Sequence, residues 1–507
     1  MKNFFTLCIA LLSICIFQVS AQAQITGKVT DSEDGSGLPG VNVIVKGTST
    51  GTTTDVNGNY SINASTGQVL VFTYVGYLNQ EFTIGSTSVI NVSLVSDTKV
   101  LEDVVVVGYG EQDKKDVTGA INSIKSEDFN QGVIASPEQL IQGRSAGVQI
   151  AATSGEPGAA VSIRIRGTSS ITNTNNPLFV LDGVPLISGS VTGAGIDAGL
   201  GSSSARNPLN FINPNDIASI DILKDASATA IYGSRGANGV VIITTKKGNG
   251  LGKGLQYSSS VSFATITKKY DLLDRDAFIA GNAALGGSAT DGGANTDWQD
   301  EILRTAVSNN HNISFGDGNA NGNYFLSLSY SDQQGIVQES GLRRVTARFN
   351  ATKKFLNDRL TVGSQIIISD IKDENAPITD NAGFEGDLLG NALKFNPTQP
   401  VRNPDGTFFQ PGVTEINPVA MLAYNEDFTN LLRTFASVTA AYEFFDGFSF
   451  KTLIGVDRSF ANRTSAWSRD LVSPQVDGVG RLFIGDNETN VQLWENYFTL
   501  DRQFGNV

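Results

Sequence analysis

Cysteine is almost absent from this chain, with two residues among 507, Cys8 and Cys15. Both lie in an apolar run from Phe4 to Val19. If that run is removed from the mature protein, no cysteine is left. Disulfide bonds, thiolate chemistry and cysteine-ligated zinc are then excluded from the mature chain.

The segment that holds both cysteines has the pattern of a secretory signal peptide. Lys2 supplies a charged start, the apolar run follows, and Ala21-Gln22-Ala23 gives an A-x-A cleavage site. The run is too short for a comfortable membrane-spanning helix. The sequence therefore predicts a signal peptide over residues 1–23, with cleavage between Ala23 and Gln24.

Histidine is scarcer still, because His311 is the single one. No H-E-x-x-H motif is present, which excludes a histidine-built zinc site. No G-x-x-x-x-G-K-[ST] phosphate loop is present either, and no nucleophile elbow lies near His311. Acidic residues are plentiful, so a catalytic pair of carboxylates stays open, but no pair stands out. The sequence predicts a protein that is not an enzyme and holds neither metal nor cofactor.

Long apolar runs and an excess of positive charge are also missing. No later run reaches eighteen apolar residues, which excludes helical membrane spans. The formal net charge is −14, so nucleic acid is not expected as a partner. Alternating strands of about ten residues escape such a search, and a composition with 54 glycines suits a transmembrane β-barrel or a secreted β-sandwich. Composition leaves both open.

Residues 24–97 predict a small β-sandwich, because short β-forming runs alternate with turn signals such as Asn57-Gly58. The runs predicted as strands are Ile25–Thr30, Val41–Val45, Gly51–Thr54, Tyr60–Ile62, Val69–Tyr74, Gln80–Ile84 and Val89–Leu94. Asp55–Asn59 has the look of a calcium loop but lacks the EF-hand glycine and closing glutamate, which favours a hairpin turn. Phrases such as ITGKVTD and GLPGVNVIVKGT resemble the carboxypeptidase-regulatory-like domain.

Residues 98–113 form a linker around LEDVVVVGYG (101–110), with four consecutive valines between acidic and polar flanks. Valine is β-branched and favours extended backbone. Such a strand can be buried in its own protein, or it can be added to the sheet edge of another protein. The pattern alone favours the buried strand.

The segment 114–248 carries the most specific phrases. They include LIQGRSAGVQI (140–150), VSIRIRGTSSI (161–171), NPLFVLDGVPL (176–186) and the long phrase at 209–248. Together with the leader, the sandwich and LEDVVVVGYG, they resemble the SusC/RagA class of TonB-dependent outer-membrane transporters. In that class the segment after the linker is a plug that fills a barrel, and the valine run is the TonB box. That context reverses the preference and favours pairing with a partner's sheet edge.

The resemblance assigns roles to individual residues. The TonB box falls on Asp103, Val104, Val105, Val106, Val107, Gly108, Tyr109 and Gly110. Four plug arginines could tether the plug to carboxylates of the barrel, since arginine pairs bidentately with them. They are Arg166, in the I-R-G phrase, and Arg164, Arg144 and Arg235. Ordinary solvated or plug-internal arginines are the alternative.

Residues 249–507 change to strands of barrel length, with apolar residues on one face and polar residues on the other. In Val345–Ala351 the apolar side chains alternate with Arg344, Thr346, Arg348 and Asn350. About eight spans are expected, fewer than the roughly 22 strands of a plugged transporter. The expected fold class is therefore mainly β: a small β-sandwich, a mixed α/β plug, and an incomplete antiparallel transmembrane β-barrel, as in the N-terminal part of a longer protein.

The resemblance implies TonB-dependent import of oligomeric nutrients, glycan or peptide, across the bacterial outer membrane. TonB, with ExbB and ExbD, would pull on the box from the periplasm, where the sandwich would also lie. A SusD-like surface lipoprotein and outer-membrane lipid are the other implied partners. A surface adhesin of stacked β domains is the alternative, and a secreted hydrolase with an accessory domain is a third interpretation.

Overall fold

The computed structural model describes residues 23–95, 104–107, 110–113 and 121–501, with internal gaps. The gaps are 33–34, 49, 75–76, 169–174, 188, 190–191, 193–204, 226–228, 249–252, 320, 379–386, 475 and 477. The chain divides into two compact units, residues 1–104 and 105–507. The predicted signal peptide lies outside the described residues up to residue 22, and strand β1 begins at Ala23.

The first unit is a β domain in which two sheets share one core. Its strands are β1 (Ala23–Asp31), β2 (Asn42–Val45), β3 (Gly51–Thr53), β4 (Asn59–Ala64), β5 (Val69–Thr73), β6 (Gln80–Thr83) and β7 (Val92–Leu94). One sheet has the order β4-β1-β7 and the other β3-β2-β5-β6. Alternate side chains face inward, so Val29, Val43, Leu70 and Phe72 are fully buried. All seven predicted strands are confirmed.

The turn at Asp55 is a hairpin turn, as predicted. Its Oδ1 atom accepts hydrogen bonds from the backbone N–H groups of Asn57 (2.9 Å) and Asn59 (2.8 Å). A side chain that bonds its own following backbone in this way is a common turn former. The carboxylate is therefore occupied in holding the link between β3 and β4.

Residues 114–248, the segment expected to be the plug and called the plug below, are built in their described part on a five-stranded sheet. The sheet order is β10-β15-β16-β13-β14, and a separate hairpin joins β11 to β12. The strands are β10 (Ile121–Lys125), β11 (Val148–Ala152), β12 (Val161–Ile165), β13 (Leu178–Leu181), β14 (Val184–Pro185), β15 (Ile217–Leu223) and β16 (Val240–Thr245). The β-branched run Val240–Thr245 predicts a buried strand, and β16 lies in the middle of the sheet and is almost wholly buried.

Short 3-10 segments connect these plug strands. They are η1 (Ser126–Asp128), η2 (Pro137–Ile141), η3 (Pro214–Asp216) and η4 (Ala230–Gly236). The small-residue run ahead of Gly233 predicts a short helix that ends at this glycine, and the described part of that run appears as η4. This segment is interrupted at Gly233, where φ is +58°, a conformation that favours glycine.

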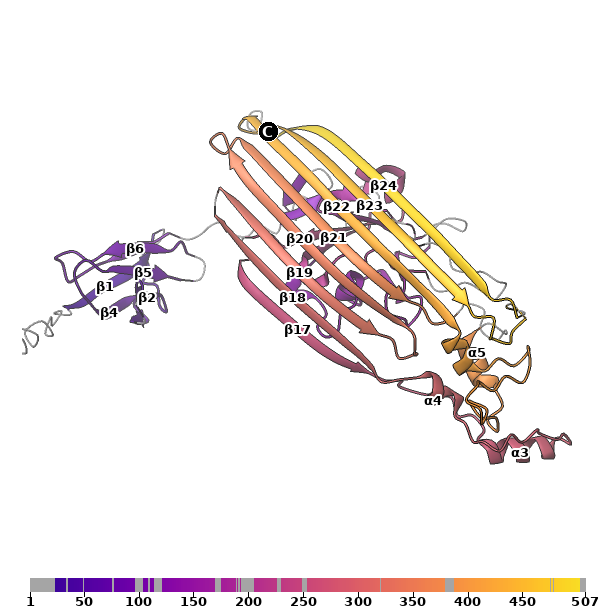
Figure 1. The fold of residues 1–507 in the computed structure, drawn as a ribbon. Helices are drawn as coiled ribbons and strands as arrows, with labels where there is room; N and C mark the ends of the chain where they lie inside the picture. Colours follow the sequence, from indigo (N-terminus) through magenta and orange to yellow (C-terminus); the bar gives the residue numbers. More distant parts are fainter. Residues whose placement is uncertain are drawn as a thin grey trace, which may run out of the picture. The chain divides into compact units, whose positions relative to one another are not determined.

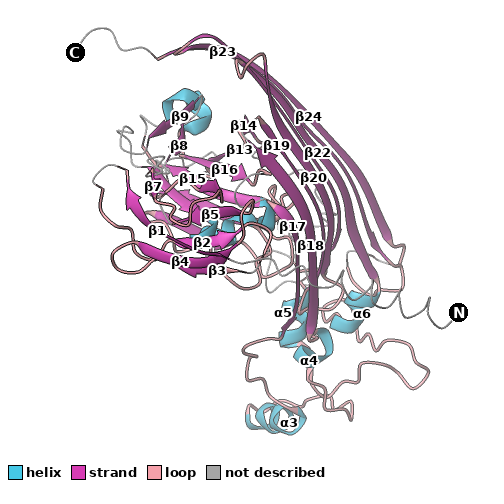
Figure 2. Ribbon diagram, turned by 90° about the vertical axis from the view of Figure 1, so that its left-hand side faces the viewer, coloured by secondary structure: helices cyan, strands magenta, loops and turns pink. Residues whose placement is uncertain are grey.

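Residues from Gly254 onward form one antiparallel sheet of eight strands in sequential order, called the wall below. The strands are β17 (Gly254–Ala264), β18 (Ala306–Asn319), β19 (Gly322–Gln334), β20 (Gly341–Phe355), β21 (Leu360–Glu374), β22 (Asn425–Phe445), β23 (Phe448–Trp467) and β24 (Arg481–Leu500). Figure 1 shows them side by side, and Figure 2 shows that the sheet curves. The expected eight spans are confirmed, and the sheet is not closed.

The two ends of the wall differ in their connections. At one end, the short-turn end, the strands are joined by 320–321, 356–359 and 446–447. At the other, the long-loop end, the connections are 265–305, 335–340, 375–424 and 468–480. Helices α3 (Arg275–Ala284), α4 (Trp298–Ile302), α5 (Leu388–Lys394) and α6 (Pro418–Ala423) lie in these loops, at the lower end of the wall in Figure 1. No helix in the described part of the chain is long and apolar enough to span a membrane.

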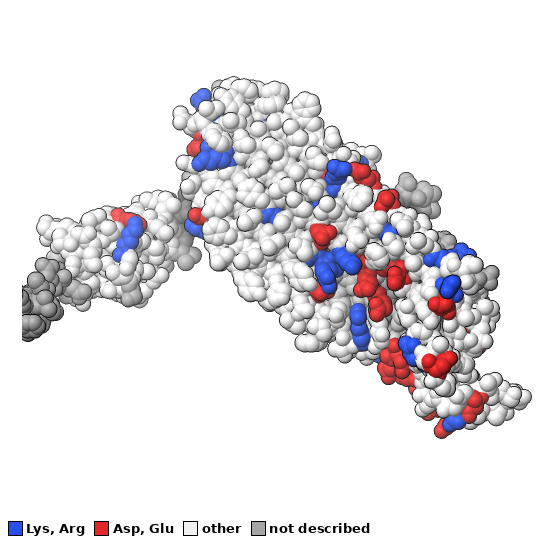
Figure 3. Space-filling view, viewed as in Figure 1, with Lys and Arg blue, Asp and Glu red and all other residues white. Residues whose placement is uncertain are grey.

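The two faces of the wall have opposite chemistry. Along β19, Leu326 and Leu328 are exposed on the outward face, whereas Ser327 and Ser329 are buried on the inward face. Figure 3 shows the outward face with few charged side chains toward the short-turn end and many toward the long-loop end. An apolar band across the outward face of strands of this length is typical of a lipid-facing surface.

The plug packs against the inward face of the wall. Buried residues of both parts join in one hydrophobic cluster, which includes Phe211 and Ile220 of the plug and Leu431 and Phe435 of the wall. The rings of Phe211 and Phe435 lie 6.5 Å apart between centroids. The plug and the wall therefore share a core, and the groups between them decide how firmly the plug is held.

Candidate functional site

The predicted TonB box is extended where the structure describes it. Val104–Val107 forms strand β8, which pairs in a two-stranded sheet with β9 (Gly110–Asp113). Asp103, Gly108 and Tyr109 lie outside the described residues. The extended geometry suits strand addition, and the assignment of the box stays a prediction.

The four arginines predicted as tethers make their contacts within the plug. Arg166 forms an ion pair with Asp225, and half of its side chain is exposed. Arg144 Nε donates to Asn130 Oδ1 at 2.9 Å, and Arg235 Nη2 donates to the Leu186 carbonyl at 3.3 Å. Arg164 is exposed on β12.

Among the described residues, none of these four side chains forms a hydrogen bond or an ion pair with the wall. For Arg166, the conformation of its own backbone explains why the side chain stays within the plug. Arg166 follows the last residue of β12 with φ at +57°, which starts a turn beside Asp225. The carboxylate that the sequence placed on the wall is therefore supplied by the plug itself.

Three other arginines do join the wall to the plug, and they belong to the wall. Arg344 Nη1 donates to the Asn210 carbonyl at 2.6 Å, and Arg433 Nη1 donates to the Pro208 carbonyl at 2.6 Å. Arg348 Nη2 donates to the Lys246 carbonyl at 2.8 Å. All three guanidinium groups are buried, and each binds a main-chain oxygen of the plug. Charged donors to carbonyl groups make strong hydrogen bonds in such surroundings.

Arg433 has the most complete set of partners. Its Nε and Nη2 atoms donate to the two carboxylate oxygens of Asp457 at 2.9 and 2.6 Å, a bidentate pair between β22 and β23. Its guanidinium also lies 4.1 Å from the centroid of the Phe211 ring. The wall thus holds the Arg433 side chain in place through Asp457. The plug then contributes the Pro208 carbonyl and the face of the Phe211 ring.

A buried polar cluster surrounds the start of β15. The Asp216 carboxylate of the plug accepts a hydrogen bond of 2.7 Å from Ser327 Oγ of the wall. Burial raises the pKa of Asp216, although the nearby charge of Arg348 favours the ionised form. Burial lowers the pKa of Lys246, where Asp216 acts in the opposite direction. Charges of both signs therefore meet where the plug touches β19 and β20.

One plug arginine does pair with the wall, but the sequence did not single it out. Arg206 Nε lies 2.6 Å from Asp373 Oδ2 of β21, and its Nη1 lies 3.8 Å from Glu156 Oε2 of the plug. All three side chains are buried. This pair lies near the long-loop end, because Asp373 is the last residue but one of β21.

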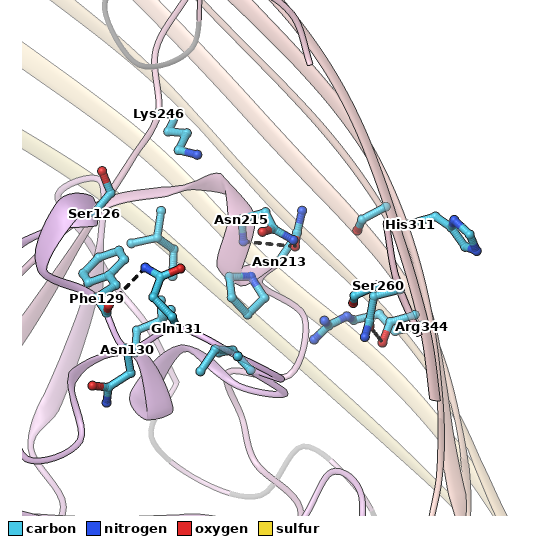
Figure 4. A pocket seen from close by; sticks show the side chains of 18 of the residues that line it. Ser126, Phe129, Asn130, Gln131, Asn213, Asn215, Lys246, Ser260, His311 and Arg344 are labelled. Carbon is cyan, nitrogen blue, oxygen red and sulfur yellow. Dashed lines mark hydrogen bonds between the residues drawn. The ribbon is translucent and has the colours of Figure 1, made fainter. Parts of the chain in front are cut away.

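Two cavities lie between the plug and the wall. One of about 330 Å³ is lined by Asn213 and Lys246 of the plug and by Ser260 and Arg344 of the wall, among others. Figure 4 shows these side chains on the plug side of the strands, whereas His311 points away to the other side. The other cavity, of about 460 Å³, lies near the short-turn end. The described residues hold no group of three or more His, Cys, Asp or Glu that could bind a metal.

His311 contributes nothing to these cavities through its ring. Its Nδ1 atom lies 3.0 Å from Tyr257 Oη and 3.1 Å from Ser259 Oγ, on the outward side of β17 and β18. The strand-like run around His311 predicts a wall residue, and this position in β18 agrees with that prediction.

Comparison with known families identifies the class of protein. A profile described as TonB-dependent Receptor Plug Domain matches residues 113–240, and one described as CarboxypepD_reg-like domain matches residues 25–107. A five-stranded plug held against a curved antiparallel sheet is the fold expected from the first match. The chain thus has the plug domain and the fold of a TonB-dependent receptor.

Its relatives narrow the class. The chain is 38% identical over 505 residues to TonB-dependent receptor P3 of Formosa agariphila, covering 98% of this chain and 48% of that protein. It is 37% identical over 463 residues to TonB-dependent receptor SusC of Bacteroides thetaiotaomicron, covering 86% of this chain and 44% of SusC. The chain therefore belongs to the SusC/RagA family. It spans about half the length of these curated relatives.

The solved structures agree on the fold. The RagAB peptide importer in its closed-closed state superposes with a TM-score of 0.63 at 22% identity, over 76% of this chain and 46% of that one. At 22% identity, this similarity shows a shared fold and nothing about function.

The sequence predicted one side of the contacts that hold the plug, the arginines of the wall, but not the plug groups that they bind. The alternation in β20 placed Arg344 and Arg348 correctly on the inward face. Their partners could not be found, because a backbone carbonyl carries no sequence signal. Arg206 had a possible signal in the phrase Arg206-Asn207-Pro208, where an arginine stands in a polar loop before the buried Leu209.

Proposed function

We propose that this chain supplies the gate and part of the wall of a TonB-dependent importer of oligomeric nutrients, glycan or peptide, across the outer membrane. The observation that carries the proposal is the plug itself. It is seated against the inward face of the wall by buried polar contacts, and a strand-forming peptide precedes it in the chain. Polar contacts can be exchanged for water when the plug is displaced, which a purely apolar seat would resist.

The orientation follows from the connections of the wall. In outer-membrane barrels the short turns face the periplasm and the longer loops face outward. The short-turn end would therefore lie in the periplasm, and so would the box and the β domain of residues 24–97. A SusD-like lipoprotein would meet the long-loop end, and TonB, energised by ExbB and ExbD, would act at the opposite end. RagAB, which shares the fold of this chain, is a peptide importer, and this supports import as the role of the assembly.

The proposed function is tested by placing a proline in the box and measuring uptake. TonB would add a strand to Val104–Val107 through main-chain hydrogen bonds, so extended backbone matters more than side chains. Val105→Pro removes a donor and cannot serve within a ladder. An unmade hydrogen bond costs roughly 1–3 kcal/mol, which corresponds to about thirtyfold in affinity at the middle of that range. We expect uptake by the full-length receptor to fall by about that factor, and Val105→Ala to be mild.

The pairing of β8 with β9 supplies a matched control. Gln112→Pro lies in β9 and disrupts the same two-stranded sheet without removing a donor from the box. We expect it to leave uptake near the wild-type level. Equal losses in Val105→Pro and Gln112→Pro would assign the effect to the local sheet, and normal uptake in Val105→Pro would refute the box. A loss of outer-membrane abundance would instead favour a buried structural strand.

A further inference from the structure

Three strands of the wall reach their first outward charge at the same distance from the short-turn end. Asp332 of β19, Asp370 of β21 and Arg458 of β23 are each the eleventh residue of their strand, counted from the short turn. The outward side chains that precede them in these strands are uncharged. A transmembrane β-strand crosses the hydrocarbon with about 9–11 residues. The apolar band therefore ends at this level, and lipid headgroups are expected beside it.

Two cations lie directly opposite each other just beyond this level. Arg343 of β20 and Lys372 of β21 are cross-strand partners, and both are exposed on the outward face. Like charges in directly opposed positions destabilise a sheet, because their Cβ atoms are only about 4.5–5.5 Å apart. An anion bound between the two side chains would remove this repulsion.

Within the described part of the chain, neither cation donates a hydrogen bond. Arg343 Nη2 lies 3.7 Å from Asp332 Oδ2, beyond hydrogen-bond distance, and 59% of the Arg343 side chain is exposed. Asp332 Oδ2 instead accepts from Tyr330 Oη at 3.2 Å. Lys372 Nζ lies 5.7 Å from the centroid of the Phe428 ring, which holds the ammonium group without accepting a conventional hydrogen bond. Both side chains therefore have donors to offer a ligand.

A third outward cation gives the contrast. Arg458 Nη2 and Nε donate to Glu488 Oε1 at 2.6 and 3.1 Å. This arginine lies at the edge of the same apolar band, but its charge is neutralised by the neighbouring strand β24. The outward face is thus able to pair its cations, and it leaves Arg343 and Lys372 open.

Carboxylates beside the two cations restrict the ligand further. Asp332 is the cross-strand partner of Arg343, and Asp370 and Glu374 stand on either side of Lys372 along β21. A bare anion would be repelled by these three groups. A headgroup that also carries hydroxyl or amide N–H donors would bind the carboxylate oxygens as well. Asp370 lies nearer the apolar band than Lys372, so the donors belong between the acyl chains and the anion.

The surface toward the short-turn end is apolar. Val345 and Ile368 are exposed there, and Ala347 lies opposite Ile368 in the sheet. Figure 3 shows the change along the outward face from few charged side chains to many. Acyl chains would lie against the apolar part, while the headgroup of the same molecule reaches the cations. The ligand that fits both parts is an amphiphile with a phosphate and a sugar in its headgroup.

We propose that Arg343 and Lys372 bind the phosphate of a phosphorylated glycolipid of the outer leaflet, whose acyl chains lie along Val345, Ala347 and Ile368. Hydroxyl or amide groups of its sugar donate to Asp332 and Asp370. The site is on the outward face of β19–β21, away from the plug. It rests on the orientation given in the proposed function, because that orientation places the long-loop end in the outer leaflet.

The test is a titration of the purified, delipidated full-length receptor in detergent with diphosphoryl lipid A, in which native mass spectrometry measures the bound lipid. We expect the double variant Arg343→Gln/Lys372→Gln to bind about tenfold more weakly, the effect of one lost charged hydrogen bond at the lower end of its range. Arg458→Gln is the matched control and should bind as the wild type does, because Arg458 is already paired with Glu488. Lipid A without its phosphates should bind the wild type as weakly as diphosphoryl lipid A binds the double variant.

Wild-type affinity in the double variant would overturn the site. An equal loss in Arg458→Gln would also overturn it, since general surface charge would then explain the effect. Phosphatidylglycerol that binds as tightly as lipid A would overturn the glycolipid as the ligand. If the double variant does not fold, Lys372→Gln alone provides the test.

The failure of this site and the failure of the proposed function give different results. Val105→Pro should bind lipid A as the wild type does. Normal uptake in Val105→Pro would refute the box and leave the lipid site standing. Lost uptake in Val105→Pro, together with wild-type lipid binding in the double variant, would leave the proposed function standing and remove only the lipid site.

Discussion

Removal of Arg433 should loosen the plug more than any of the four arginines that the sequence singled out. Neither Arg433 nor Asp457 is exposed beyond 1% of its side chain. Arg433→Met would leave the Asp457 carboxylate buried without its partner, which costs about 3–5 kcal/mol. It would also remove the hydrogen bond to the Pro208 carbonyl.

The second substitution separates these two effects. Arg433→Met combined with Asp457→Leu leaves no buried charge, and replacing both partners of such a pair is often close to neutral. The double variant still lacks the charged hydrogen bond to Pro208, worth roughly 1.5–3 kcal/mol. We therefore expect the double variant to be more stable than the single one, and still less stable than the wild type.

The assay is denaturant unfolding of the full-length receptor in detergent, followed by protease sensitivity of the plug. The single variant should lose protection of the plug at the lowest denaturant concentration, and the double variant at an intermediate one. If the double variant is as unstable as the single, the buried carboxylate is not the cause. If neither differs from the wild type, Arg433 does not hold the plug.

Two further predictions concern the plug and the first unit. Glu138 is buried and accepts from Asn207 Nδ2 at 3.1 Å, and burial raises its pKa above the ordinary value of 4.5. The folded plug therefore holds that proton more tightly than the unfolded chain, so its stability falls as pH rises above 4.5, by at most about 1.4 kcal/mol per pH unit. Glu138→Gln should remove this dependence, measured as the denaturation midpoint against pH, and an unchanged slope would contradict it. Residues 24–97, which we propose as a separate domain, should melt cooperatively in isolation with a β-type circular dichroism spectrum; a disordered peptide would refute this.

Sequence patterns predicted the elements of this chain better than the contacts between them. The strands of the wall were visible because Val345, Ala347 and Phe349 alternate with polar residues, and a period of two defines both a strand and its faces. Core strands such as β16 were visible as β-branched runs. These signals depend only on residues that are close together in the chain, so a single sequence is enough to detect them.

Contacts between the plug and the wall join residues that are far apart in the chain. Arg433 and Pro208 are separated by 225 positions, and the acceptor is a carbonyl that every residue possesses. Arg166 was chosen from a motif, but its backbone turns it toward Asp225. A motif can therefore mark a plug residue without stating which partner it binds.

The use of main-chain acceptors has a consequence for how the plug can be released. Arg344, Arg348 and Arg433 are held in the wall, and each binds a carbonyl group of the plug. Substitutions of plug side chains at Asn210 or Lys246 would leave those carbonyls in place. The seat would therefore respond to movement of the plug backbone, which changes where the carbonyls point. In the import that we propose, a pull on the chain ahead of the plug would act on the backbone directly, so a seat of this kind would suit a mechanical signal from the proposed box.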